Sequence, residues 1–124
     1  MQKPALFFTM GLFWKSDSDR IIEQIQAKVS YINHHLLKLQ NSLIANNGAS
    51  DANIDELNYI CERLLQQQND LNNLLQRLPP SKQNSIGVPW VDGSYSSLFA
   101  WMMTYNVAVA KLQHALKKYY GNTF

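Results

Sequence analysis

The chain has 124 residues, of which 46% are apolar, and its formal net charge is +2. This composition is that of one globular domain spanning residues 1–124, and it excludes a disordered chain and a dedicated nucleic-acid binder with a large basic excess. Cys61 is the only cysteine, so an internal disulfide is excluded and a cytoplasmic location is expected.

The segment ALFFTMGLFW, residues 5–14, is the first notable feature of the chain because it contains no charged residue. Lys3 in front of it imitates a secretion signal, but the KSDSDR sequence that follows offers no cleavage site. Ten residues are also too few to cross a bilayer, which takes about twenty. Since the segment has no polar face, we expect it to pack on the third helix and not on a membrane.

A first helix is predicted over residues 18–46, because apolar residues recur there at alternating spacings of three and four. Ser16 and Asp19 fit a capping box at its start, and Gly48 is suited to a left-handed cap after its end. The apolar stripe consists of Ile22, Ile25, Val29, Ile32, Leu36, Leu39 and Leu43.

A second helix is predicted over residues 53–78, with Gln68 interrupting its apolar stripe. Asn53 and Glu56 fit another capping box, and Pro79 with Pro80 ends the helix because proline lacks the backbone donor. The stripe consists of Ile54, Leu57, Cys61, Leu64, Leu71, Leu75 and Leu78.

A long connection follows at residues 79–93, with the sequence PPSKQNSIGVPWVDG. Loops of this length without periodicity are uncommon and are often functional or packed down by their own side chains. We therefore expect a loop whose apolar centre, which includes Trp90, either holds it onto the bundle or contacts a partner.

The third helix is predicted over residues 94–120 and carries two apolar faces. A helix that is apolar on most sides needs more cover than two partner helices provide, and residues 5–14 or a second subunit are the candidates. The first face consists of Leu98, Met102, Tyr105, Val109, Leu112 and Leu116, and the second of Phe99, Trp101, Met103 and Val107.

These elements predict an all-α fold. Its architecture is an antiparallel bundle of three long helices, with the short apolar N-terminal segment packed on the third helix.

One short motif points to a specific chemistry. The run His35-Leu36-Leu37-Lys38 resembles the H-x-L-K core of histidine phosphotransfer domains, which are helical bundles of about this size. The resemblance implies that His35 would accept a phosphoryl group and that Lys38 would help to neutralise it. Leu39 stands where that family has a small glycine, and the alternative is that His34 and His35 are simply solvent-facing helix residues, which we favour.

Other chemistries have less support in the sequence. No glutamate has a histidine three residues later, and Cys61 has no basic neighbour to activate it, so we expect no metal site, no cofactor and no enzymatic activity. Basic and aromatic residues near the C-terminus are the basis for an alternative, nucleic-acid binding, which the near-neutral charge disfavours. They are Lys111, Lys117, Lys118, Tyr119 and Tyr120.

By exclusion, the sequence favours a non-enzymatic protein–protein interaction module, such as an adaptor, a chaperone-like cofactor or an inhibitor of another protein. Its partner would be another protein, and a homodimer is one form of that association. Aromatic residues are the usual anchors of such contacts. The candidates are Phe8, Phe13, Trp14, Trp90 and Trp101.

Overall fold

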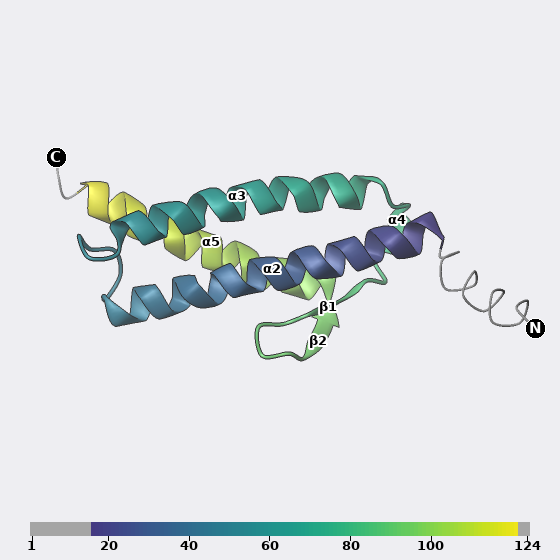
Figure 1. Ribbon diagram of the computed structural model, residues 1–124, viewed down its shortest axis with the longest axis horizontal. Helices are drawn as coiled ribbons and strands as arrows, with labels where there is room; N and C mark the ends of the chain where they lie inside the picture. Colours follow the sequence, from purple (N-terminus) through teal and green to yellow (C-terminus); the bar gives the residue numbers. More distant parts are fainter. Residues whose placement is uncertain (1–15, 122–124) are drawn as a thin grey trace, which may run out of the picture.

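The computed structural model describes residues 16–121, and these form a bundle of three long helices with a small β-hairpin (Figure 1). The predicted bundle is confirmed, and its helices alternate in direction (Figure 1). The predicted packing of residues 5–14 on the third helix lies outside the described residues. The elements are α2 (Asp17–Ala45), α3 (Ile54–Gln76), α4 (Pro80–Gln83), β1 (Gly87–Pro89), β2 (Tyr95–Ser97) and α5 (Leu98–Gly121).

Both ends of α2 follow the sequence signals. The Ser16 hydroxyl accepts a hydrogen bond from the Asp19 backbone N–H at 3.1 Å, which satisfies one of the free donors at the helix start. After the last turn, Gly48 has a φ of +107° and its N–H donates to the Leu43 carbonyl at 2.8 Å. Glycine adopts this left-handed conformation without steric cost, so the chain can reverse here toward α3.

The predicted capping box at Asn53 and Glu56 is wrong, because the Asn53 side chain makes no cap hydrogen bond to α3. Its amide instead holds the connection between α2 and α3. The Nδ2 group donates to the Ser42 hydroxyl at 3.0 Å and to the Gly48 carbonyl at 2.9 Å, while Oδ1 accepts from the Ser50 N–H at 2.8 Å. Asn53 is buried, so these bonds satisfy a polar group that has left water.

The core lies between the three long helices and continues under the hairpin. The predicted stripes supply most of it, although some of their members, such as Cys61 and Val109, are only half-buried. The buried Ile21, Ile60 and Trp101 lie outside the stripes. The buried apolar residues are Ile21, Ile25, Val29, Ile32, Leu36, Leu39, Leu57, Ile60, Leu64, Leu71, Leu78, Ile86, Val88, Leu98, Trp101, Tyr105 and Leu112.

The connection after α3 is not the predicted loop of residues 79–93. It contains α4 and the antiparallel β1–β2 pair, in which Val88 lies opposite Ser96, and α5 begins at Leu98 instead of residue 94. Ile86 and Val88 alternate into the core, and at the turn Gly93 has a φ of +88° while the Asp92 carboxylate accepts from the Ser94 N–H. Burial of alternate residues and a turn suited to glycine favour a hairpin over a loop.

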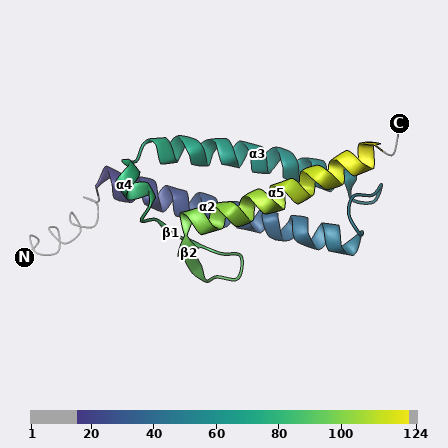
Figure 2. The same ribbon diagram turned by 180° about the vertical axis from the view of Figure 1, so that it is seen from behind.

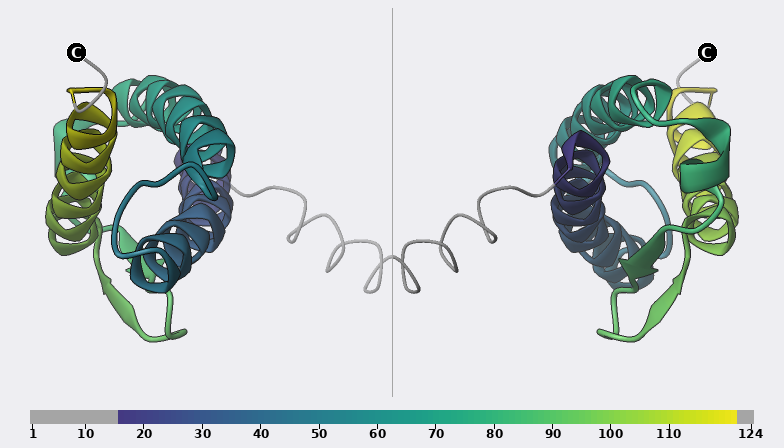
Figure 3. Two further views of the ribbon diagram at one scale, coloured as in Figure 1. Left: turned by 90° about the vertical axis from the view of Figure 1, so that its left-hand side faces the viewer. Right: turned by 90° about the vertical axis from the view of Figure 1, so that its right-hand side faces the viewer.

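Helix α5 crosses the other two helices obliquely. It begins next to the hairpin, beside the middle of α2, and ends beside the N-terminal end of α3 (Figure 2). Viewed along the bundle, the hairpin projects beyond the three helices (Figure 3). Because α5 moves toward α3 along its length, it separates from the C-terminal half of α2.

Candidate interaction surface

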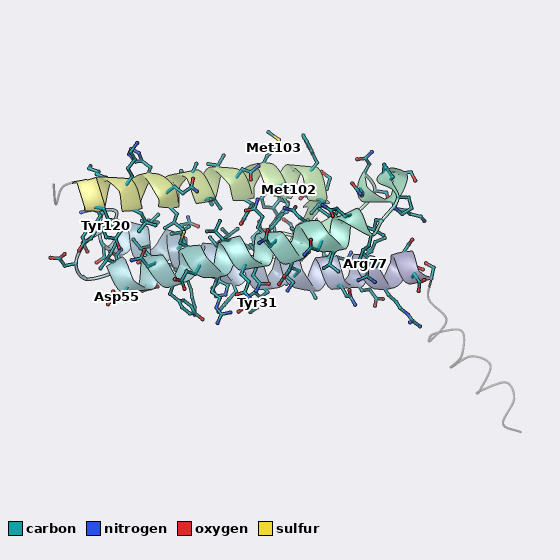
Figure 4. The ribbon with its side chains drawn as sticks, turned by 90° about the horizontal axis from the view of Figure 1, so that it is seen from above. Tyr31, Asp55, Arg77, Met102, Met103 and Tyr120 are labelled. Carbon is teal, nitrogen blue, oxygen red and sulfur yellow. The ribbon has the colours of Figure 1, made fainter. Side chains whose placement is uncertain are left out.

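The outer face of α5 is apolar and open. Phe99, Met103 and Val107 follow one another at a spacing of four and are 75%, 57% and 56% exposed. Residues four apart lie on the same side of a helix, so the three form one continuous stripe, which we call the α5 stripe. Figure 4 shows Met103 pointing away from the bundle, whereas the neighbouring Met102 points toward the other helices. The chain from Gly93 to Ala110 contains no charged residue.

A groove with a volume of about 400 Å³ lies beside this stripe, where α5 diverges from α2. We call it the α2–α5 groove. Lys111 is its only charged lining residue, and Gln40 and Thr104 are the other polar ones. Its apolar lining consists of Leu36, Leu39, Leu43, Ile44, Val91, Val107 and Ala108, among which Ile44 is 69% exposed.

Two other hollows in the described part of the chain are less apolar. The one between α2 and α3 contains Lys28 and Asp70, whose side chains form an ion pair at 3.5 Å. The one at the far end of the bundle is lined by Asp51, His114 and Lys118, among other residues. A continuous apolar surface that includes both a ridge and a groove, with Lys111 as its only charged residue, is therefore found at α5. Such surfaces mark sites of contact with other molecules.

Asn33 fixes the position of α5 at one end of this surface. Its Nδ2 group donates to the Pro89 carbonyl of β1 at 2.7 Å, and its Oδ1 accepts from the Trp101 indole N–H at 2.7 Å. Asn33 and Trp101 are both buried, so each polar group has exchanged water for a protein partner. The hairpin is further held by Gln26, which donates to the Gly87 carbonyl at 2.8 Å.

Tyr105 fixes α5 to α3 one turn further on. Its hydroxyl donates to the Leu64 carbonyl at 3.1 Å and lies 3.4 Å from Oε1 of Gln68, the residue that interrupts the predicted stripe of α3. The Tyr105 ring stacks on Trp101 with centroids 5.3 Å apart. Burial disfavours the charged phenolate and raises the pKa of Tyr105 to about 12.

The C-terminal residues proposed for nucleic-acid binding are partly engaged in holding the bundle together. The Tyr119 hydroxyl donates to the Asp51 carboxylate at 2.6 Å, and this hydrogen bond raises the pKa of Tyr119. The Tyr120 hydroxyl accepts from the Asn58 amide at 2.7 Å. Both tyrosines thus tie the last turns of α5 to α3 and the loop before it, while Lys111 lies at the groove.

Of the sequence-predicted partner residues, the structure describes Trp90 and Trp101. Trp101, which was expected to contact a partner, is only 1% exposed. It belongs to the core, where its indole N–H donates a hydrogen bond to Asn33. Trp90 is half-buried and packs against the core at the turn of the hairpin. Phe8, Phe13 and Trp14 lie outside the described residues. Among the described residues, exposed apolar side chains gather on the α5 stripe and beside the groove, and others, such as Leu37 and Leu65, lie elsewhere.

The expectation that His35 faces solvent is wrong, because its side chain is only 4% exposed. The Tyr31 and Tyr59 rings lie 4.8 and 6.3 Å from it, and neither imidazole nitrogen has a hydrogen-bond partner among the described residues. Burial, assisted by the nearby positive groups of His34, Lys38 and Arg63, lowers the pKa of His35. A phosphotransfer histidine must be reached by a partner protein, and His35 is covered while Lys38 is exposed.

Residues 16–121 contain no cluster of three or more His, Cys, Asp or Glu side chains placed to hold a metal ion. In the same part of the chain, no helix is long and apolar enough to cross a membrane. Comparisons with protein-family models, with curated proteins and with solved structures found no match to this chain.

Sequence reasoning missed Asn33 and the hairpin, although signals for both are present. A tryptophan buried in a helix needs an acceptor for its N–H, and this requirement points to a polar residue on a facing helix such as Asn33. The Asp92-Gly93 pair between the buried Ile86 and Val88 and the polar strand at Tyr95 is typical of a hairpin turn.

Proposed function

We propose that this chain is a non-enzymatic protein-binding module whose contact surface comprises the α5 stripe and the α2–α5 groove. The observation that carries the proposal is the exposure of Phe99, Met103 and Val107 on one uncharged stripe beside an apolar groove. An apolar ridge next to an apolar groove is the arrangement that receives an amphipathic or apolar helix of a partner.

The energetics agree with this function. Moving a phenylalanine or methionine side chain from water into an apolar contact lowers the free energy by about 1.5–3 kcal/mol. Phe99, Met103, Val107 and Ile44 lie in open positions, so a partner that covers them removes this apolar surface from water. The polar bonds of Asn33 and Tyr105 hold α5 in place, so little ordering is needed when a partner binds.

Charged substitutions on this surface test the proposal. We expect a chain with Phe99→Glu and Val107→Glu to lose binding partners, because a buried unpaired carboxylate opposes association. Leu65→Glu is the matched control, since Leu65 on α3 is 49% exposed and lies outside the groove. All three chains, immobilised, are compared by quantitative mass spectrometry of the proteins they retain from a cell extract.

The expected result is at least one protein retained by the unchanged chain and by the Leu65→Glu control but lost by the double variant. Circular dichroism must show equal helicity for all three chains. Identical sets of retained proteins would contradict the proposed surface.

A further inference from the structure

The α2–α5 groove has the dimensions of a site for one more short helix. Along α2 it extends from Leu36 to Ile44, which is about 12 Å at a rise of 1.5 Å per residue. Three-helix packing is complete where α5 contacts α2 near Trp101, but beyond that point the helices diverge and the groove opens between them. A helical occupant of this groove is apolar and contacts it over about eight residues.

The chain itself contains one segment of that kind outside the described residues. Residues 5–14 are uncharged and include Phe7, Phe8, Phe13 and Trp14. In helical conformation ten residues span about 15 Å, close to the length of the groove. The segment and the groove therefore match in length and in apolar character.

Within one chain, however, the segment cannot reach the groove as a helix. Leu36 lies nineteen positions after Asp17, which is about 29 Å along α2. Residues 15 and 16 extend over only about 7 Å, so a helix of residues 5–14 stays near the start of α2. An extended segment reaches further, but its backbone N–H and C=O groups would then lack partners in an apolar groove.

Two copies of the chain remove this obstacle. The start of α2 lies at one end of the bundle (Figure 1). The groove lies beside the C-terminal part of α2, from Leu36 to Ile44. A two-fold axis that places two bundles side by side in opposite directions brings each α2 start next to the groove of the other copy. Such an exchange is closed and uses the same contact twice, as in most homodimers.

We propose that residues 5–14 of a second copy of this chain occupy the α2–α5 groove, and that the two copies exchange these segments mutually. The inference rests on the proposed function and names the partner. Each aromatic side chain can bury about 150–250 Å², so the eight aromatic residues of two segments carry about 1,200–2,000 Å². A stable interface of standard size buries about 1,600 Å² in total.

Three full-length variants separate the donor of the exchange, residues 5–14, from its acceptor, the α2–α5 groove. Phe8→Glu with Phe13→Glu disables the donor, because these positions lie on different sides of a helix and one charge meets the groove in any orientation. Val107→Glu disables the acceptor at the α5 wall of the groove, and Ile44→Glu does so independently at the α2 wall. Leu65→Glu is the matched control, and circular dichroism confirms that each variant keeps its helicity.

Light scattering on a sizing column gives the mass of each purified chain. We expect twice the chain mass for the unchanged protein and for Leu65→Glu, and a single chain mass for the donor and acceptor variants. The dissociation constant should rise on the order of a hundredfold, since an unpaired carboxylate must enter an apolar site.

Mixing the donor variant with an acceptor variant is the decisive step. One functional segment and one functional groove remain in the pair, so we expect a mixed dimer that neither variant forms alone. A monomeric unchanged chain, a donor variant that still dimerises, or helical variants that form no mixed dimer would each overturn the inference. Light scattering on the purified chain tests only association between copies, and the extract comparison tests binding of any protein. If the purified chain is monomeric but the extract comparison finds a lost protein, the surface binds a different partner. If both experiments are negative, the proposed function fails as well.

Discussion

Helix α5 meets α2 in two different ways along its length. Near its start, Trp101 is buried and bonded to Asn33, which also holds the hairpin, so three elements share one satisfied polar group. One to three turns later the two helices line an apolar groove with exposed walls at Val107 and Ile44. Within residues 16–121 the first region is buried, whereas no other element covers the second. The buried polar bond thus marks where α5 closes onto α2, and apolar side chains are exposed further along the same helix.

The largest effect on stability is expected from Asn33→Leu. This substitution removes both hydrogen bonds of Asn33, the one to Trp101 of α5 and the one to Pro89 of β1. The Trp101 indole and the Pro89 carbonyl would each lose a partner at 2.7 Å. An unsatisfied buried group costs about 1–3 kcal/mol, so we expect the free energy of unfolding to fall by about 3 kcal/mol. Urea unfolding measures the change, and Asn41→Leu, at an exposed position of α2, is the control. A loss below that of the control would show that Asn33 does not hold α5.

The second prediction concerns Tyr105 at alkaline pH. The pKa of Tyr105 is about 12 in the folded chain against 10.0 for a free tyrosine, so the unfolded chain releases this proton first. The protonated Tyr105 hydroxyl therefore makes its full contribution to the free energy of unfolding below pH 10. This contribution is lost as the pH rises through about 12. At pH 11 the loss reaches about 1.4 kcal/mol, one pKa unit of free energy.

Tyr105→Phe removes this titration and leaves the other tyrosines unchanged. Between pH 9 and pH 11 the unchanged chain should therefore lose about 1.4 kcal/mol more stability than the variant. Equal losses in urea unfolding at both pH values would show that the Tyr105 hydroxyl is not buried as described.

The third prediction uses His35, which is buried two residues after Asn33 but has unpartnered ring nitrogens among the described residues. We expect His35→Leu to leave the free energy of unfolding at pH 7 unchanged or to raise it by about 1 kcal/mol, because the cost of an unsatisfied polar group disappears. Asn33→Leu should therefore lower the free energy of unfolding, whereas His35→Leu should not, because only Asn33 has hydrogen-bond partners within the described residues.

The same variant tests the pH dependence. The pKa of His35 is lowered by burial first and by the nearby positive groups second, so folding favours its neutral form. The stability that this neutral form confers is present above the ordinary pKa of 6.5 and is lost as the pH falls below it. Between pH 7 and pH 5 the unchanged chain should lose stability relative to His35→Leu. A higher stability of the unchanged chain at pH 5 would contradict this.

The smallest effect on stability is expected from Val107→Glu in the open groove. Val107 is 56% exposed, and surface substitutions away from special features usually change stability by less than about 0.5 kcal/mol. Urea unfolding should be measured at high dilution, where association does not contribute. A loss of 2 kcal/mol or more would mean that Val107 belongs to the core and not to a contact surface.

The sequence predicted the three helices well because their apolar periodicity is sustained and their ends carry caps, as at Ser16 and Gly48. Periodicity did not predict the hairpin, since strands of three residues are too short to show a period, and its signal in the sequence is the Asp92-Gly93 turn. The two apolar faces of α5 were also recognised, but periodicity does not say which residues a crossing helix covers. Trp101 was therefore grouped with Phe99, Met103 and Val107, although its bond to Asn33 places it inside.

Neighbouring methionines on α5 allow the most direct test of the contact surface. Met102 packs against the core and Met103 lies on the outer stripe (Figure 4). Oxidation by dilute hydrogen peroxide follows exposure, and mass spectrometry resolves the two sites. In concentrated unchanged chain we predict that Met103 reacts nearly as slowly as Met102, and that it reacts several times faster after dilution or in Val107→Glu. A Met103 rate that is fast and identical in all of these samples would contradict the proposal that a second copy of this chain covers the outer face of α5.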